Sequence, residues 1–199
     1  MLFLFTDIEG STRLWEKYGE AMGEALQQHD AILENEIGLW GGQIIKHTGD
    51  GIFAVFPSGN PLEFALHVQR QLRAHDWGNI GKLRVRYAIH AGQAQHRNGD
   101  YFGATINQTT RLLAAGHGEQ ILLTATAARA MCVPSGSSLE RLGNYRLKGL
   151  SQPLTVFELT QPDGRQPTFF SRLWRLRPWI GLPTARLVTI RQQAHSLMA

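Results

Sequence analysis

Two spacings of apolar residues alternate along the chain, one typical of strands and one typical of helices. The apolar runs at residues 2–5 and 44–56 have the length of strands, and Asp50-Gly51 inside the second run is a strong hairpin signal. At residues 64–72, apolar side chains recur three and four positions apart, which predicts an amphipathic helix. A chain that alternates in this way predicts strands and helices packed in layers.

The predicted order of elements defines the fold class. It is a strand at 2–5, a long helical stretch from Ser11 or Thr12 that bends near Gly19 and ends at Gly41-Gly42, the hairpin at 44–56, a helix at 61–73, a strand at 83–89, a loop at 92–99, a helix at 105–115, a strand at 120–123, a short helix at 126–131 and a closing hairpin at 139–159. This order predicts an α+β fold in which helices pack on a mainly antiparallel sheet.

The composition fits one globular domain with an extension. The chain has 199 residues, of which 43% are hydrophobic, and it contains no apolar stretch of the roughly twenty residues that a membrane span needs. Met1 leads directly into a strand without a charged leader, and Cys132 is the single cysteine, so we expect neither secretion nor disulfides. A cytoplasmic location is the resulting expectation.

The charge is divided unevenly between two parts of the chain. All 16 acidic residues lie up to Asp163, and six of the 20 basic residues follow it, so the first part carries −2 and the remainder +6. Residues 161–164 resemble a linker, and we therefore expect a catalytic or binding domain at 1–160 and a basic, aromatic-containing tail at 161–199.

Two aspartates carry the candidate chemistry. Asp7 follows the first apolar run, and Asp50 lies at the tip of the hairpin, so neighbouring strands could bring the two carboxylates together. Paired carboxylates are suited to Mg²⁺ or Mn²⁺, and two such ions can assist a phosphoryl displacement. Alternatively, Asp50 merely forms a turn before Gly51, and Asp7 caps a helix.

The segments around these aspartates resemble the metal-binding stretches of class III nucleotidyl cyclases. Residues 5–12 fit the pattern F-x-D-I-x-G-(F/S)-T and residues 46–50 fit K-x-x-G-D, and the resemblance covers residues 2–159. It implies a ferredoxin-like βαββαβ core with a C-terminal hairpin. It also implies that Asp7, Asp50 and the backbone carbonyl of Ile8 bind two divalent cations.

The resemblance implies a nucleoside triphosphate as substrate, and its phosphate groups need hydrogen-bond donors. Gly10, Ser11 and Thr12 stand at a predicted helix start, where free N–H groups and the helix dipole attract phosphate oxygens. The lysine of a Walker motif is missing, which excludes a P-loop. By resemblance, Lys148 in the Leu147-Lys148-Gly149 turn holds the departing pyrophosphate.

The resemblance also assigns the residues that read the base and stabilise the transition state. Lys46 and Asp100 stand at the purine-reading positions, and a Lys/Asp pair favours ATP over GTP. Asn107 and Arg111, one helical turn apart, match the residues that orient the ribose and stabilise charge at the α-phosphate. His47 should face away from Lys46 because neighbouring strand residues alternate, so we expect a structural role for it.

These residues together predict an adenylate cyclase. The 3′-hydroxyl of ATP would attack the α-phosphate in line, giving 3′,5′-cyclic AMP and pyrophosphate, with one metal lowering the pKa of the hydroxyl and the other binding the phosphates. In this family the metal-binding acids come from one subunit and the remaining residues from the other, which implies a head-to-tail homodimer.

Two alternatives of other classes remain open at this point, besides a guanylate cyclase. The domain could be a catalytically silent nucleotide-binding or regulatory dimerisation module. The tail could instead carry the function, binding an anionic membrane surface or nucleic acid through a short basic helix that contains Phe169, Phe170, Leu173 and Trp174.

Overall fold

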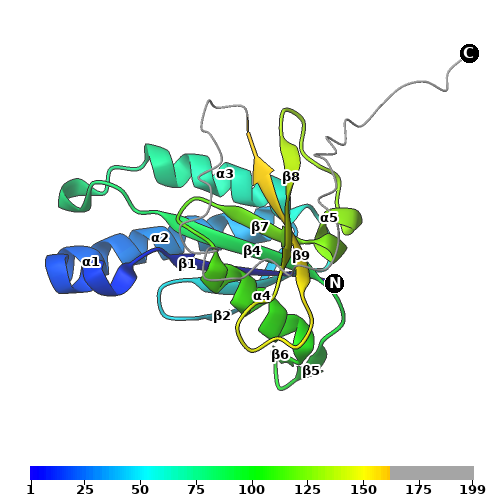
Figure 1. The fold of residues 1–199 in the computed structure, drawn as a ribbon. Coiled ribbons are helices and arrows are strands. Elements are labelled where there is room, and N and C mark those ends of the chain that lie inside the picture. The colour runs from blue at the N-terminus through cyan, green and yellow to red at the C-terminus, as the bar shows by residue number, and fades with distance from the viewer. Residues whose placement is uncertain (162–199) are drawn as a thin grey trace, which may run out of the picture.

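The computed structural model describes residues 1–161, so the sequence-based expectations for the tail at 162–199 lie outside the described residues (Figure 1). In the described part the elements are β1 (Leu2–Ile8), α1 (Ser11–Tyr18), α2 (Glu20–Leu39), β2 (Gln43–His47), β3 (Ile52–Phe56), α3 (Pro61–Ala74), the short 3₁₀ helix η1 (Gly78–Ile80), β4 (Val85–Ala91), β5 (Gln95–Arg97), β6 (Asp100–Phe102), α4 (Ala104–Ala115), β7 (Ile121–Thr124), α5 (Ala125–Ala130), β8 (Ser138–Tyr145) and β9 (Leu154–Thr160).

A seven-stranded sheet with the order β2-β3-β1-β4-β7-β9-β8 forms the centre of the fold. Only β4 and β7 pair in parallel among the described strands, and the other neighbours are antiparallel. The first four neighbours have the order of a ferredoxin-like βαββαβ unit, and β7 to β9 extend it. The predicted α+β class with a mainly antiparallel sheet is therefore confirmed.

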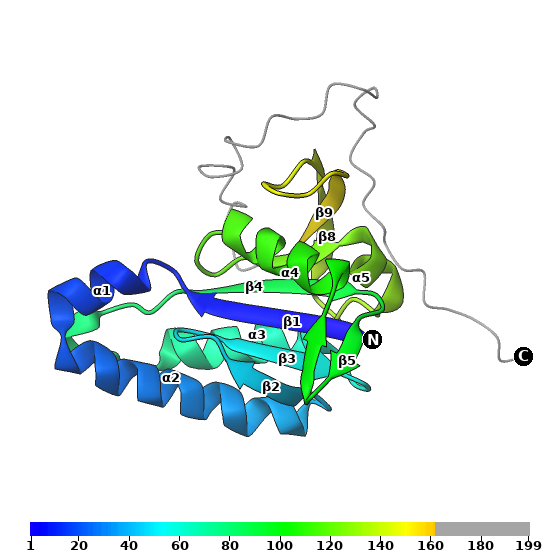
Figure 2. The same ribbon diagram turned by 90° about the horizontal axis from the view of Figure 1, so that it is seen from below.

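Helices cover the two faces of the sheet unequally (Figure 2). One face packs against α2 and α3 through a large apolar core that includes Leu4 and Ile8 of β1. The opposite face packs against α4 through a smaller core that includes Phe3, Phe5 and Phe53. Because side chains alternate along β1, Asp7 shares its face with Phe3 and Phe5 and thus lies on the α4 side.

Three of the differences from the sequence-based predictions have a clear physical reason. The first strand continues through Ile8, because Asp7 and Ile8 pair with Arg86 and Val85 of β4. The bend at Gly19 is a full break between α1 and α2, since Gly19 has φ +50°. The predicted loop at 92–99 contains β5, which pairs with β6 across an Asn98-Gly99 turn in which both residues have positive φ.

Glu158 is a buried acid whose ionisation should set the pH dependence of stability. It is 7% exposed in β9, opposite Leu122 of β7 and Glu140 of β8. Burial raises the pKa of Glu158 to about 7, and the charge of Glu140 acts in the same direction, although a hydrogen bond with Gln120 lowers it. The folded state holds the proton of Glu158 more tightly than the unfolded state does, so Glu158 contributes its full stabilisation below the ordinary pKa of 4.5. This stabilisation is lost as the pH rises through 7.

We therefore expect Glu158→Gln, which mimics the protonated acid, to match the wild type in acid and to exceed it in base. The free energy of unfolding should differ little near pH 4.5 and favour the variant by on the order of 2 kcal/mol near pH 8.5. Urea denaturation across this pH range measures the difference, with Glu24→Gln on the exposed side of α2 as control. A difference that does not change with pH would contradict the assignment.

Candidate active site

Asp7 and Asp50, the predicted metal ligands, lie where β1 meets the β2–β3 turn. The Ile8 N–H donates to the carbonyl oxygen of Asp50 over 3.0 Å, and the Thr6 hydroxyl accepts from the Ile52 N–H over 3.0 Å. These two bonds hold the turn that carries Asp50 against the strand that carries Asp7. Burial is the main cause that raises the pKa of the Asp7 carboxyl, and the negative charge of Asp50 acts in the same direction.

Gly51 is the residue that permits this approach. A Cβ atom at Gly51 would lie 1.9 Å from the Thr6 carbonyl oxygen and 2.7 Å from the Asp7 Cα, distances that no side chain can occupy. Asp50-Gly51 therefore does more than form a hairpin turn. Its glycine lets the turn lie directly on β1, which brings the segment that carries Asp50 against the strand that carries Asp7.

Arg86 of β4 is a functional candidate that the sequence analysis missed. Its Nε donates to Asp7 Oδ1 over 2.6 Å, and its Nη2 pairs with Asp7 Oδ2. Burial raises the pKa of the Asp7 carboxyl, while the hydrogen bond and charge of Arg86 act to lower it. The sequence predicts a strand at 83–89, which contains Arg86, but only the pairing of β1 with β4 reveals the partner of Arg86.

The site chemistry fits divalent cations. The available donors are two carboxylates and a backbone carbonyl, which are hard oxygen ligands. Asp7 is partly buried and pairs with Arg86, so a metal ion there would compete with Arg86 for the carboxylate. Among residues 1–161 no group of three or more His, Cys, Asp or Glu side chains could hold a metal ion by itself. A metal at Asp7 and Asp50 would therefore complete its coordination with phosphate or water oxygens.

Lys46 and Asp100, the predicted base-reading pair, form an ion pair although they are 54 positions apart. The hydrogen bond from Lys46 lowers the pKa of Asp100. Tyr101 and Phe53 lie beside the pair, with their ring centroids 6.3 Å apart, and the Lys46 Nζ lies 5.9 Å from the centre of the Phe53 ring. The Lys46–Asp100 pair thus lies next to aromatic side chains and presents a hydrogen-bond donor and an acceptor at the same place.

A bulge in β2 directs Lys46 to this face. In the β2–β3 ladder, Ile44 pairs with Ala54 and Lys46 pairs with Phe53, so Ile45 is an extra residue. Without this bulge, Lys46 would share the face of Ile44 and point toward α2. The bulge therefore reverses the direction that simple alternation from Ile44 would give.

The remaining predicted residues lie on α4 and nearby loops. Asn107 and Arg111 are exposed on α4, and a Cβ atom at Gly149 would lie 3.7 Å from Arg111 Nε, so the turn with the exposed Lys148 is next to Arg111. Gly10 precedes α1 with φ +71°, and Ser11 and Thr12 begin that helix, which has no side-chain cap. The structure thus places the candidate residues in four groups.

Comparison with known proteins agrees with this architecture. The model of the adenylate and guanylate cyclase catalytic domain family matches residues 1–161, and the chain belongs to this family. A Mycobacterium tuberculosis protein of uncharacterized function is 32% identical over 168 residues, which cover 82% of this chain and 56% of that protein. Adenylate cyclase 2 of Rhizobium meliloti is 31% identical, covering 80% and 49%.

Solved structures show the same fold. A structure of an adenylate cyclase from Trypanosoma brucei in its monomeric state aligns with a TM-score of 0.76 and 25% identity, covering 88% of this chain and 92% of that one. The chain spans about half the length of the curated relatives named above. No helix among residues 1–161 is long and apolar enough to cross a membrane.

The close approach at Gly51 can be tested by substitution. We expect Gly51→Ala to lower the free energy of unfolding by more than about 2 kcal/mol, because β1 or the turn must move to admit the methyl group. Gly38→Ala is the control, since nothing lies within 4 Å of a Cβ there. It should stabilise α2 by roughly 0.5 kcal/mol. Denaturant unfolding measures the stability of both variants. Equal stability of Gly51→Ala and the wild type would contradict the close contact between Gly51 and β1.

Proposed function

We propose that the chain is the catalytic domain of an adenylate cyclase, which converts ATP to 3′,5′-cyclic AMP and pyrophosphate. The ion pair between Lys46 and Asp100 carries the proposal, because it joins distant segments at the two positions that the family uses to read a purine. Membership of the cyclase family and the similarity to named adenylate cyclases support it. The Lys/Asp combination favours ATP over GTP.

In the proposed reaction, Asp7, Asp50 and the Ile8 carbonyl hold two divalent ions. When bound, these ions neutralise phosphate charge and lower the pKa of the attacking 3′-hydroxyl. Arg86 would exchange part of its contact with Asp7 for contact with the phosphates, which are anionic partners as well. The N–H groups at the start of α1, from Gly10 to Thr12, would donate to the triphosphate.

The nucleotide's other groups have their own partners in this proposal. Lys46 donates to the purine edge and Asp100 accepts from it, while Asn107 orients the ribose. Arg111 stabilises the charge that develops at the α-phosphate, and Lys148 binds the departing pyrophosphate. Arg111 lies beside the turn that contains Lys148 and Gly149, which supports a shared role for the positively charged side chains of Arg111 and Lys148.

The proposed active unit is a head-to-tail homodimer. The metal-binding acids of one protomer would face Lys46, Asp100, Asn107 and Arg111 of the other, so that two-fold symmetry creates two equal sites. The exposure of Asn107 and Arg111 is what this arrangement requires, because neither side chain is covered within one chain.

One observation favours a second candidate, a nucleotide-binding module without turnover. Arg86 contacts both carboxylate oxygens of Asp7, and a cation that stays there would compete with metal. The two candidates differ in what they predict for the purified protein. An enzyme forms cyclic nucleotide, whereas a silent module binds nucleotide without forming product.

With ATP and Mn²⁺, we expect the purified protein to form cyclic AMP and pyrophosphate and to prefer ATP to GTP. Asp7→Ala and Asp50→Ala should each reduce the rate at least about a hundredfold, since each removes a metal ligand. Chromatographic product analysis measures the rates, and circular dichroism shows whether the variants fold. Nucleotide binding without product in the wild type would establish the silent module.

Shared sites can be tested by mixing two inactive variants. Asp50→Ala and Arg111→Ala should each be inactive alone, because every site of a homodimer then lacks one function. After mixing, about half of the dimers are mixed, and each has one intact site of two, so about a quarter of wild-type activity should return. No recovery from variants that demonstrably exchange subunits would contradict the shared-site model.

A further inference from the structure

We propose that His47 is a positioning residue that fixes Lys46 for base recognition by clamping strand β2 to helix α2. The inference rests on the proposed function, because it concerns the residue that would read the purine. It assigns part of the nucleotide selectivity to a contact on the far side of the edge strand from the site.

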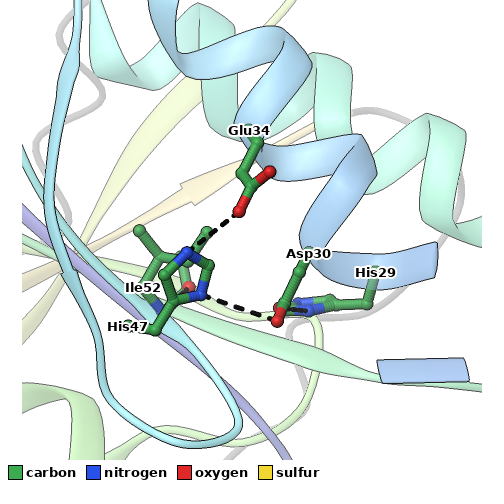
Figure 3. Close-up of polar contacts among 6 residues, drawn as sticks. His29, Asp30, Glu34, His47 and Ile52 are labelled. Carbon is green, nitrogen blue, oxygen red and sulfur yellow. Dashed lines mark hydrogen bonds and ion pairs between the residues drawn. The ribbon is translucent and has the colours of Figure 1, made fainter. Parts of the chain in front are cut away.

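His47 stands between two carboxylates of α2 (Figure 3). Its Nε2 lies 3.0 Å from Glu34 Oε1, and its Nδ1 lies 3.5 Å from Asp30 Oδ2. Each ring nitrogen thus faces one acid, and an imidazolium satisfies both because its two nitrogens are both donors. The histidine is 41% exposed, so its contacts with α2, rather than burial, hold it in place.

The clamp is anchored in the protein core. Asp30 Oδ1 lies 2.8 Å from Nδ1 of His29, whose side chain is completely buried under the sheet (Figure 3). The other oxygen, Oδ2, faces His47. A chain of contacts therefore runs from the core through His29 and Asp30 to His47, and it fixes the direction of the Asp30 carboxylate.

The position of the clamp explains why it bears on Lys46. The extra residue at Ile45 interrupts the β2–β3 ladder immediately before Lys46, and β2 is the edge strand of the sheet. A bulged edge strand has an unpaired residue and only one neighbouring strand to hold it. His47 directly follows Lys46 and pairs with Ile52, so holding His47 on the α2 face holds Lys46 on the opposite face.

Hydrogen exchange tests the clamp without any assumption about activity. In His47→Ala, amide exchange in residues 43–47 should be about fivefold faster than in the wild type, while α3 stays unchanged. His75→Ala is the matched control, because His75 also contacts α2, through Gln28, but lies at the end of α3. Unchanged exchange in residues 43–47 of His47→Ala would overturn the proposal.

Nucleotide binding tests the consequence for selectivity. The probes are 3′-deoxy-ATP and 3′-deoxy-GTP, which lack the attacking hydroxyl and report binding alone. Relative to wild type, His47→Ala should reduce the preference for the adenine nucleotide roughly fivefold, and it should have no further effect in a Lys46→Ala background. His47→Arg, which can pair with both acids, should restore most of the preference.

The outcomes separate this inference from the proposed function. A wild type that prefers 3′-deoxy-ATP but forms no cyclic nucleotide contradicts the enzyme and leaves the clamp supported if His47→Ala loses the preference. An equal loss of preference with and without Lys46 would overturn the clamp, since His47 would then act independently. A wild type without preference would overturn it as well.

Discussion

The contact between Gly51 and strand β1 is the constraint on which the site depends. Backbone atoms of Thr6 and Asp7 fill the space that any larger residue would need at position 51. The Ile8 and Thr6 hydrogen bonds then fix the turn in place, and Asp50 follows by its position beside Gly51. The approach of two acids is unfavourable in itself, so the fold must enforce it. The backbone contact between Gly51 and β1 holds the two acids near each other, and the positive charge of Arg86 offsets part of their repulsion.

Much of the fold follows from local pattern, and the exceptions have physical causes. Apolar periodicity predicts the helices at 61–73 and 105–115 because each buries one face, and the structure has them at 61–74 and 104–115. It fails at β5, whose residues Gln95–Arg97 are all polar, and only the Asn98-Gly99 turn indicates the hairpin with β6. It also fails at the end of β1, since Asp7 remains in the strand through pairing with Arg86, which lies 79 positions away.

The candidate site divides in the same way between what is local and what is not. Motif spacing identifies Asp7, Asp50, Lys46 and Asp100, and the structure joins the last two in an ion pair. Spacing cannot identify Arg86, because its importance comes from a partner in another strand. Nor can it identify the bulge at Ile45, since a bulge changes the direction of Lys46 without leaving a mark in the apolar pattern. The expected division of roles between two protomers comes from the family resemblance and not from residue spacing.

The edge strand β2 connects candidate residues that belong to two different sites of the proposed dimer. Its end leads into the turn with Asp50, its bulge directs Lys46, and His47 binds it to α2. In the proposed homodimer, this short strand thus carries the residue proposed to read the base in one site and leads to a residue proposed to bind metal in the other site. A displacement of β2 would therefore disturb both sites of the dimer. Because the strand has a single neighbour, the contacts of His47 with Asp30 and Glu34 provide the second attachment that holds both residues in register.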